Sequence, residues 1–444
     1  MNLGNVSRKN FIKSSSLLLG GLMAQGNAVF ADGQQEQHPI QSSGSKSLLL
    51  KNVRLETGFH YENEIVSGTK TDLFTLEIVE GKIKNIQPNN PNAKAIDAKG
   101  YLMLPAFRDM HIHLDKTFYG GPWKANTKRN RTVKDMIALE QQIIPELLKT
   151  STYRAEKLIE LLQSKGSSYA RSHVNIDPTS KLDSLKNLEL ALQRKKNSFQ
   201  AELVAFPQHG VYYTKSEPWM KEAAKMDIDF IGGLDPYAID GDTAKGLDFI
   251  VKLAMENHKG IDIHLHEGGA EGLNAVEFLI DRVNENPALK GRTFLSHCFV
   301  LAKLEKAKLE EVSEKLAHAQ IGIVSTIPMG SRLMPIPTLY KYGVNVMTGN
   351  DSIIDHWDTF GTGNVLQKCN LMAQLYGYRT EQELSRCLKL ATGNVLPLDE
   401  QGNRQWPKVN DTANLVLVEA SCSAEAVARI SPVKSLIHEG NVVF

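Results

Sequence analysis

The chain has 444 residues, of which 42% are hydrophobic and 23% charged, and its formal net charge at pH 7 is +1. This length exceeds what one simple core usually holds, but a barrel of alternating strands and helices with a small accessory domain would account for it. The balanced charge leaves no basic face for a phosphate backbone, so the composition argues against a nucleic-acid-binding protein.

The first 31 residues have the features of a removable export signal. A basic start from Ser7 to Lys13 is followed by the apolar run Leu17 to Met23, and Val29-Phe30-Ala31 supplies a cleavage site. The apolar run is too short for a stable membrane anchor, so we expect a cleaved signal at 1–31 and a polar linker at 32–46. The basic segment resembles a twin-arginine signal in which Lys9 replaces the second arginine.

We therefore expect a periplasmic or otherwise exported protein without a membrane anchor, with the twin-arginine export machinery as a partner. The general secretory route and a cytoplasmic location are the alternatives, and association into a homo-oligomer stays open. An oxidising compartment would allow one disulfide, but the four cysteines lie far apart in the sequence, at Cys298, Cys369, Cys387 and Cys422.

Both ends of the remaining chain have the pattern of short strands. The N-terminal segments alternate in hydrophobicity and are broken by Gly, Asn and Pro; they are Ser47–Val53, Thr75–Val79, Gly81–Ile86 and Ala95–Asp97. The C-terminal segments are Asp411–Val418 and Val433–Phe444, with Gly440 at a hairpin turn. The pattern predicts one small, discontinuous β domain made of 47–103 and 409–444.

Between these ends, at 104–408, apolar strand candidates alternate with amphipathic helices. The predicted helices are Leu182–Lys196, Thr243–His258, Ala270–Asn284 and Leu301–Ala317. The eight predicted strands are Leu102–His113, Tyr169–Ile176, Glu202–Pro207, Asp229–Leu234, Gly260–His266, Thr293–His297, Gln320–Ser325 and Val344–Thr348. Alternation of this kind predicts an α/β fold, a (β/α)8 TIM barrel.

A polar residue stands near the carboxyl end of each predicted strand: His111, His173, Gln208, Asp235, His264, His297, Ser325 and Asp351. The spacings between them are 62, 35, 27, 29, 33, 28 and 26 residues, and all but the first fit one βα unit of about 30 residues. Because barrel enzymes build their sites at this face, we expect the active site here. The long first spacing holds a loop, Phe118 to Arg131, which we expect to act as a lid.

Four of these positions form a predicted site for a divalent zinc or iron ion. His111 and His113 are two apart on a strand, so their imidazoles share one face. His264 offers a third nitrogen and Asp351 an oxygen, which leaves a coordination position open for water. His266 is a rival third ligand, and His173 is the weakest candidate.

Two further residues stand beside this predicted ion. Glu267 follows the ligand strand and is placed to carry a proton from the bound water, unless it is only an exposed residue at a helix N-terminus. His297 would hydrogen-bond the hydroxide or orient the group under attack, unless it is a core histidine.

Together with the motifs around them, these residues resemble the cytosine deaminase branch of the metal-dependent amidohydrolase superfamily. The resemblance runs from about Leu49 to the C-terminus. It is carried by motifs in order along the chain: Leu104-Pro105, His111-Ile-His113-Leu-Asp115, Ser172-His173-Val174-Asn175, Ala205-Phe206-Pro207-Gln208, His264-Leu-His-Glu267, Ser296-His297, Asn350-Asp351, Asp355-His-Trp357 and Gly361.

The resemblance implies a barrel hydrolase with one catalytic ion. By position it assigns His111, His113, His264 and Asp351 as metal ligands, and Asp351 also as a catalytic residue. It further assigns Glu267 as the proton shuttle, His297 as a histidine beside the ligands that contacts the bound water, and Gln208 as the side chain that holds the amide edge of a ring. Pro207-Gln208 and Asp235 stand where relatives with two metals have a carboxylated lysine, so one ion is expected.

Two departures from cytosine deaminases bear on the substrate. Ser352 stands in place of a second aspartate, and His209 in place of an acidic residue. The loss of a charged acceptor at 352 would remove a contact worth roughly 1.5 to 3 kcal/mol, which argues against cytosine itself. We expect Trp357, His209 and Trp123 to frame a pocket for another flat ring.

The predicted reaction is hydrolytic deamination of a small nitrogen heterocycle. A bound divalent ion lowers the pKa of water from about 16 to about 7, so that hydroxide attacks a C=N carbon and ammonia leaves. Hydrolysis of a cyclic amide or of an N-alkylamino substituent is the alternative on the same scaffold, and a non-catalytic exported metal-binding protein is another. Lys116 is either part of a structural ion pair or a catalytic group. Trp357 is either a residue of the hydrophobic core or part of the pocket wall.

Overall fold

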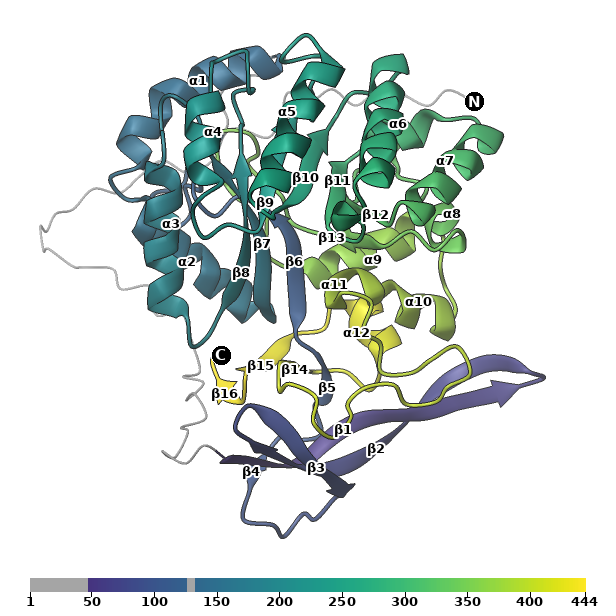
Figure 1. Ribbon diagram of the computed structural model, residues 1–444. Helices are drawn as coiled ribbons and strands as arrows, with labels where there is room; N and C mark the ends of the chain where they lie inside the picture. The colour runs from purple at the N-terminus through teal and green to yellow at the C-terminus, as the bar shows by residue number, and fades with distance from the viewer. Residues whose placement is uncertain (1–46, 126–131) are drawn as a thin grey trace, which may run out of the picture. The chain divides into compact units, whose positions relative to one another are not determined.

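The computed structural model describes residues 47–125 and 132–444 (Figure 1). The predicted export signal at 1–31, the linker at 32–46 and the last part of the predicted lid lie outside the described residues. No helix among the described residues is long and apolar enough to cross a membrane. All four cysteines are described, and each is a buried free thiol rather than half of a disulfide.

Eight parallel strands form the predicted TIM barrel, each paired with its neighbour in chain order from β6 to β13 (Figure 1). They are β6 (Phe107–Ile112), β7 (Ser167–Asn175), β8 (Gln200–Phe206), β9 (Phe230–Leu234), β10 (Gly260–Leu265), β11 (Thr293–His297), β12 (Ile321–Ser325) and β13 (Val346–Thr348).

Twelve α-helices are found in the described residues, most of them between barrel strands. They are α1 (Val133–Leu147), α2 (Ser151–Ser164), α3 (Asp183–Lys195), α4 (Glu217–Ala223), α5 (Thr243–Glu256), α6 (Ala270–Glu285), α7 (Lys306–His318), α8 (Ile336–Lys341), α9 (Val365–Leu375), α10 (Glu381–Cys387), α11 (Lys389–Thr392) and α12 (Ser423–Arg429). Three short 3-10 helices accompany them: η1 (Pro287–Leu289), η2 (Phe299–Lys303) and η3 (Gly330–Arg332). The long first spacing holds two helices, α1 and α2.

The barrel closes where the segment after β13 meets β6. The backbone N–H of Asp351 donates to the carbonyl of His111 at 2.7 Å. A Cβ on Gly349 would overlap the backbone of His111, so only glycine permits this close approach. The closure therefore places Asp351 beside His111, although 240 residues separate them in the sequence.

One strand prediction is wrong in its extent. Leu102–His113 was expected to be a single barrel strand, but the chain divides it into β5 (Leu102–Pro105) and β6, with Ala106 between them. β5 pairs antiparallel with β14 (Leu415–Val418) in a separate sheet. The apolar run is continuous because β5 contributes to both cores: Leu102 and Leu104 belong to the large cluster that also holds Phe107 and Ile112 of β6, and Met103 belongs to the core of the separate sheet. Hydrophobicity alone therefore does not mark the boundary.

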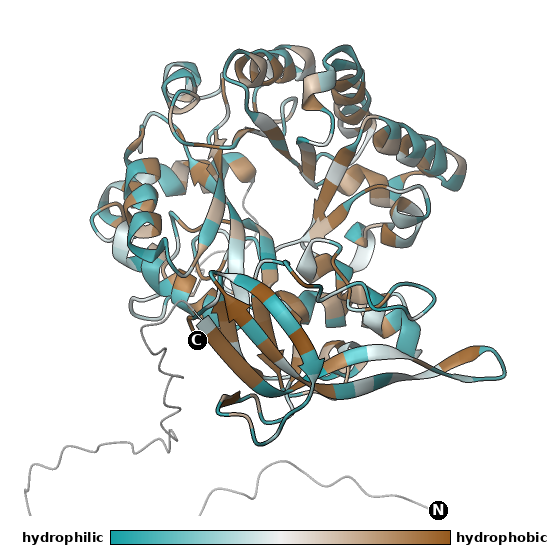
Figure 2. Ribbon diagram, turned by 60° about the horizontal axis from the view of Figure 1, so that its bottom comes forward, coloured by the Kyte–Doolittle hydropathy of each residue, from teal (hydrophilic) through white to brown (hydrophobic). Residues whose placement is uncertain are grey.

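Both ends of the described chain form this separate sheet, as the fold prediction requires. Its strand order is β16-β15-β14-β5-β1-β2-β3, and β4 also pairs with β1. The strands not yet given are β1 (Ser47–Glu62), β2 (Ile65–Val79), β3 (Lys82–Pro88), β4 (Ile96–Asp97), β15 (Val433–His438) and β16 (Asn441–Val442). Gly440 has φ +79° in the turn between β15 and β16, which explains the glycine there. Hydrophobic and hydrophilic residues alternate in bands along the long strands of this sheet (Figure 2).

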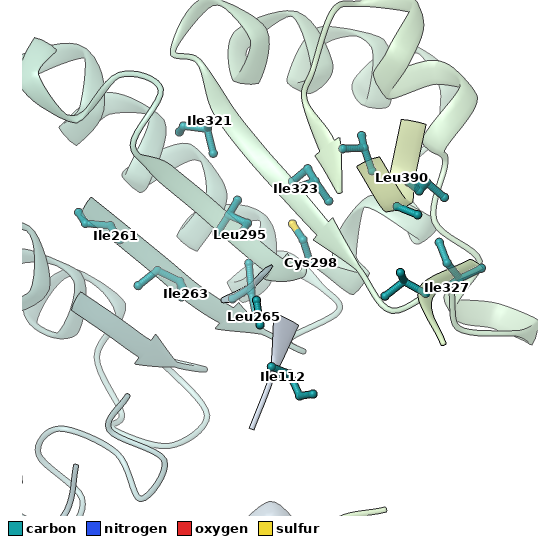
Figure 3. Packing of buried hydrophobic residues seen from close by; sticks show 14 of the residues in the cluster. Ile112, Ile261, Ile263, Leu265, Leu295, Cys298, Ile321, Ile323, Ile327 and Leu390 are labelled. Carbon is teal, nitrogen blue, oxygen red and sulfur yellow. The ribbon is translucent and has the colours of Figure 1, made fainter. Parts of the chain in front are cut away.

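Alternation along the barrel strands separates the core from the site. In β10, Ile261, Ile263 and Leu265 belong to the large hydrophobic cluster that includes the surrounding helices (Figure 3). The residues between them, Asp262 and His264, point to the opposite face, into the barrel. The same two-residue period therefore supplies both the packing and the polar groups of the interior.

Candidate active site at the carboxyl ends of the barrel strands

A cavity of about 580 Å³ opens at the carboxyl ends of the strands. Seven of the residues predicted for the site line it: His113, Gln208, His264, His297, Asp351, Ser352 and Trp357. His111 is fully buried beneath them. The volume lies in the range of small-molecule sites, so the cavity can take a ring-sized ligand.

The cavity floor is a group that we call the histidine cluster: His111, His113, His173, His264 and Asp351. The Nε2 atoms of His111 and His113 each lie 3.4 Å from Asp351 Oδ1. The potential ligand atoms of His111, His113 and Asp351 all lie within 4.8 Å of one another, and so do those of His111, His173 and His264. The four predicted ligands thus fall into two groups that share His111, and His173 stands with His264.

The hydrogen bonds around His111 determine its tautomer. The Ser296 hydroxyl donates its one hydrogen to Asp262 Oδ1 at 2.7 Å, so it must accept from His111 Nδ1, 2.9 Å away. The proton therefore sits on Nδ1, and Nε2 presents a lone pair to the Asp351 carboxylate.

His113 is arranged in the same way. Its Nδ1 lies 3.2 Å from the carbonyl of His173, which can only accept, so Nδ1 carries the proton. Burial and the nearby Lys116 lower the pKa of His113 to about 3, which keeps the ring neutral. Two lone pairs and a carboxylate oxygen thus converge with no proton among them, an arrangement that fits a bound cation.

The other two histidines of the cluster have no hydrogen-bond partner among the described residues at either ring nitrogen. The His264 ring stacks on Phe206 with centroids 4.0 Å apart and lies 4.4 Å from the His173 ring. Burial holds the pKa values of both histidines well below the usual range. Neutral, unpartnered and buried imidazoles are suited to ligate a metal.

His297 reaches the site because its backbone leaves the regular strand conformation. In a regular strand its side chain would point to the face opposite that of Ser296, away from the barrel interior. Its φ of +66° is instead in the left-handed region, and Asp351 likewise has φ +67°. Its ring lies 5.2 Å from the His264 ring, and its Nε2 lies 3.8 Å from Asp351 Oδ2. Such strained positions concentrate at functional sites.

The rival ligand His266 is held away from the cluster. Its Nδ1 lies 2.8 Å from Asp235 Oδ2, and its backbone N–H donates to the same carboxylate. Although burial opposes it, the Asp235 carboxylate raises the pKa of His266, which favours the charged form. His266 lines the cavity wall but belongs to neither group of potential ligands.

Glu267 is fixed by its neighbours at one oxygen only. Its Oε1 accepts from the backbone N–H groups of Tyr237 at 3.0 Å and Ala238 at 2.8 Å. Its Oε2 is buried and has no partner in the described part of the chain. Burial raises the pKa of Glu267, which brings the carboxyl group closer to exchanging a proton near neutral pH. Glu267 does not stand among the lining residues of the cavity.

Lys116 sets the orientation of Gln208. Its Nζ donates to Gln208 Oε1 at 2.6 Å, and both side chains line the cavity. An ammonium group has no acceptor, so the amide oxygen must face it. The amide nitrogen is then the group that Gln208 offers to a bound ring.

Behind Lys116 is a group that we call the charged network: Lys116, Glu140, Asp177, His209 and His356. Glu140 Oε1 lies 3.5 Å from Lys116 Nζ and from His356 Nε2, and Glu140 Oε2 lies 3.0 Å from His209 Nε2. His209 Nδ1 lies 3.4 Å from Asp177 Oδ1. All five residues are buried.

This network gives His209 other partners than the predicted contact with substrate. His209 is fully buried and does not line the cavity. Burial disfavours its charged form, but the carboxylates of Asp177 and Glu140 outweigh burial and raise its pKa to about 9. His209 is therefore a cation between two carboxylates, and Glu140 links it to Lys116 at the cavity.

The remaining predicted pocket residues differ in position. Ser352 and Trp357 line the cavity, and the Lys116 ammonium lies 5.5 Å from the centre of the Trp357 ring. Trp123 does not line it, and its side chain is 70% exposed.

The sequence interpretation missed Glu140, Lys303 and Arg332. Glu140 lies on α1 between Ile137 and Ile144, on the helix face that is buried. A carboxylate on an apolar helix face is a signal that would have found it. Lys303 and Arg332, which also line the cavity, end two short 3-10 helices and have no such signal.

Comparisons with known proteins agree with this fold and with the predicted family. The family model described as "Amidohydrolase family" matches residues 162–444. The uncharacterised protein YahJ of Escherichia coli K12 is 51% identical over 400 residues, which cover 89% of this chain and 87% of that protein.

Two solved structures are similar over most of the chain. The N-isopropylammelide isopropylaminohydrolase of Burkholderia multivorans has a TM-score of 0.78 at 25% identity, covering 90% of this chain and 98% of that one. The 5-methylcytosine deaminase of Klebsiella pneumoniae, liganded with phosphonocytosine, has a TM-score of 0.75 at 25% identity, covering 89% and 98%.

Proposed function

This chain belongs to the amidohydrolase family, and from that premise we propose that it is a metal-dependent deaminase of a small nitrogen heterocycle. Members of this family are metal-dependent hydrolases of carbon–nitrogen bonds, and the histidine and aspartate groups described above could hold the metal. The finer statements, deamination and a heterocyclic ring as substrate, are the proposal.

One observation carries the proposal: the lone pairs of His111 and His113 meet the Asp351 carboxylate at the floor of a ring-sized cavity. We propose His111, His113, His264 and Asp351 as the ligands of one zinc or iron ion. His173, whose ring lies 4.3 Å from that of His111, is the neighbour that would pack against them. When bound, a divalent ion makes water nucleophilic near neutral pH.

The protein's own residues would carry out the remaining steps. Water adds its oxygen to the C=N carbon of the ring, and Glu267 takes one proton from it through the unpartnered Oε2. Glu267 passes this proton to the ring nitrogen, and the second proton of the water then moves from the added hydroxyl to the amino group. The carbon–nitrogen bond to the amino group breaks, ammonia leaves, and the ring keeps a carbonyl. His297, close to Asp351, would stabilise the oxygen that develops negative charge.

Gln208 and Trp357 would hold the ring. Because Lys116 occupies the amide oxygen of Gln208, the amide nitrogen donates to an acceptor on the ring edge, such as a carbonyl oxygen. Trp357 supplies an aromatic surface for the ring face. Ser352 leaves room on the floor and adds no charge.

A second candidate function is hydrolysis of an N-alkylamino substituent, with release of an alkylamine. It is favoured by the similarity to N-isopropylammelide isopropylaminohydrolase. The same addition and elimination would serve both reactions, and only the leaving group differs.

The test is a product screen with the purified protein loaded with zinc or iron. Ammonia and alkylamines are measured separately over pyrimidines, triazines, pterins, purines and creatinine. Glu267→Gln should abolish turnover and retain the metal, while Glu271→Gln, an exposed residue at the start of α6, should change neither. Unchanged turnover in Glu267→Gln, or turnover in chelated protein, would contradict the proposal.

A further inference from the structure

The cavity has a basic wall that the proposed chemistry does not use. Lys303 ends η2 and Arg332 ends η3, and these two short helices pack against each other. Both side chains line the same cavity as His113 and Asp351, and Ser331 lies beside Arg332. We call Lys303 and Arg332 the rim cations, since both are exposed at the mouth of the cavity.

Neither rim cation has a carboxylate partner within 4.0 Å among residues 47–125 and 132–444. Lys303 Nζ donates to the carbonyl of Gly268 at 3.2 Å, and the Arg332 guanidinium lies 5.2 Å from the centre of the Phe299 ring. By contrast, Lys308, near Lys303 in the sequence, contacts both Glu277 and Glu311. The rim cations are thus placed and held near the cavity without being neutralised.

The acidic residues around the cavity are engaged elsewhere. Asp351 belongs to the histidine cluster, and Asp235 holds His266. Asp358 also lines the cavity, but its Oδ1 accepts from the Phe360 N–H, and no ion pair joins it to either rim cation. An anion that entered along this wall would therefore meet two cations and a serine hydroxyl.

From these positions we propose that the substrate ring bears an anionic substituent, a carboxylate or a phosphate, which Lys303 and Arg332 bind. This inference rests on the proposed function and adds to it the substrate class. Arginine offers a planar pair of donors that matches a carboxylate or phosphate, and lysine adds a point charge. The cavity is larger than a bare pyrimidine ring requires, which leaves space for such a group between the ring and the rim.

Pairs of compounds that differ only in the anionic group test this inference. One arm compares cytosine with cytosine-5-carboxylate and 6-methylpterin with pterin-6-carboxylate, and the other compares cytidine with cytidine 5′-monophosphate. Amine release is measured with the metal-loaded protein, and binding is measured separately by calorimetry. We expect at least one anionic member to have a KM about 10-fold or more below that of its neutral partner, an advantage that added salt reduces.

Two variants assign the preference to the rim. Lys303→Gln and Arg332→Gln should each raise KM for the anionic compound by about 10-fold or more, and leave its kcat and the KM of the neutral partner within about twofold. Lys306→Gln, an exposed lysine that does not line the cavity, is the matched control and should behave as the wild type.

The outcomes separate this inference from the proposed function. If neutral rings are deaminated and no anionic partner binds better, or if both variants impair neutral and anionic compounds equally, the rim site is wrong and deamination stands. If an anionic ring binds through Lys303 and Arg332 and no ring of the panel is hydrolysed, the rim site stands and the proposed function fails. If no anionic compound binds more tightly than its neutral partner, the inference is wrong.

Discussion

The histidine cluster and the charged network are both buried and both built from titratable side chains, yet they differ in what their polar atoms contact. In the cluster, His111 Nε2 and both ring nitrogens of His173 and His264 lack a hydrogen-bond partner among the described residues. In the network, the single carboxylate of Glu140 contacts three side chains, those of Lys116, His209 and His356. Buried polar groups are normally satisfied, so the cluster calls for a ligand from outside. The network also has three atoms without a hydrogen bond, Glu140 Oε1, His209 Nδ1 and His356 Nε2, but each lies within 3.5 Å of a charged group of the network itself, which serves to hold Lys116 and Gln208.

The strongest test of this contrast is to remove one ligand from the cluster. His111→Asn should lose the metal and lower kcat by about 10³-fold or more, because the cation supplies several kcal/mol of transition-state stabilisation. Metal content by mass spectrometry and amine release measure the two effects. His438→Asn is the control, since His438 is also a buried histidine without partners but lies in the small sheet. Equal loss of metal in both variants would mean that the unpartnered nitrogens of the cluster are not specific.

The second test breaks the charged network. Glu140→Gln leaves Lys116 and His209 without their shared counter-charge, and it should lower the free energy of unfolding by about 3 to 5 kcal/mol. Urea unfolding followed by circular dichroism measures the loss. Glu160→Gln is the matched control: its ion pairs with Lys157 and Lys195 are partly exposed, so it should cost less than about 1 kcal/mol. A cost of Glu140→Gln no greater than that of Glu160→Gln would show that the network is not structural.

The two groups also differ in how far the sequence predicts them. Each imidazole of the cluster lies on or at the end of a strand, where a two-residue period determines the face, so His111, His113 and His264 follow from local pattern. Asp351 follows from the eight-unit spacing. The closeness of His173 to His111 and His264 does not follow from local pattern, because it depends on three strands meeting in the barrel.

The charged network and the rim cations depend on contacts that no local pattern contains. Glu140 comes from the helix inserted after β6 and meets His209 from the β8 end, 69 residues later. Lys303 and Arg332 end short 3-10 helices that come after β11 and β12. Such helices are too short to produce a repeating hydrophobic pattern in the sequence. His297 enters the site because its own backbone and that of Cys298 are left-handed, a conformation that neither residue type signals in the sequence.

The pH dependence of stability provides a third test, because His209 is held as a cation. Its pKa is raised from the usual 6.5 of an unfolded chain to about 9 on folding, so it stabilises the folded state fully below pH 6.5, and this stabilisation is lost as the pH rises through 9. This contribution is about 3 kcal/mol. The free energy of unfolding, measured in urea from pH 6 to 10, should therefore fall more steeply in the wild type than in His209→Gln. Parallel curves for the two proteins would mean that His209 is not charged in the network.

The smallest expected effect tests whether the cluster depends on its surroundings. Ser296→Ala removes the oxygen that accepts from His111 Nδ1, so the ring loses the bond that fixes its tautomer and orientation. Loss of such a partner typically weakens metal binding by about 10- to 100-fold, while the ligands themselves stay in place. Competition with a chelator measures the affinity. Ser325→Ala is the control, because this buried serine at the end of β12 bonds a backbone N–H and no histidine. If Ser296→Ala binds metal as tightly as Ser325→Ala, His111 is oriented by packing alone, and the tautomer argument for the cluster fails.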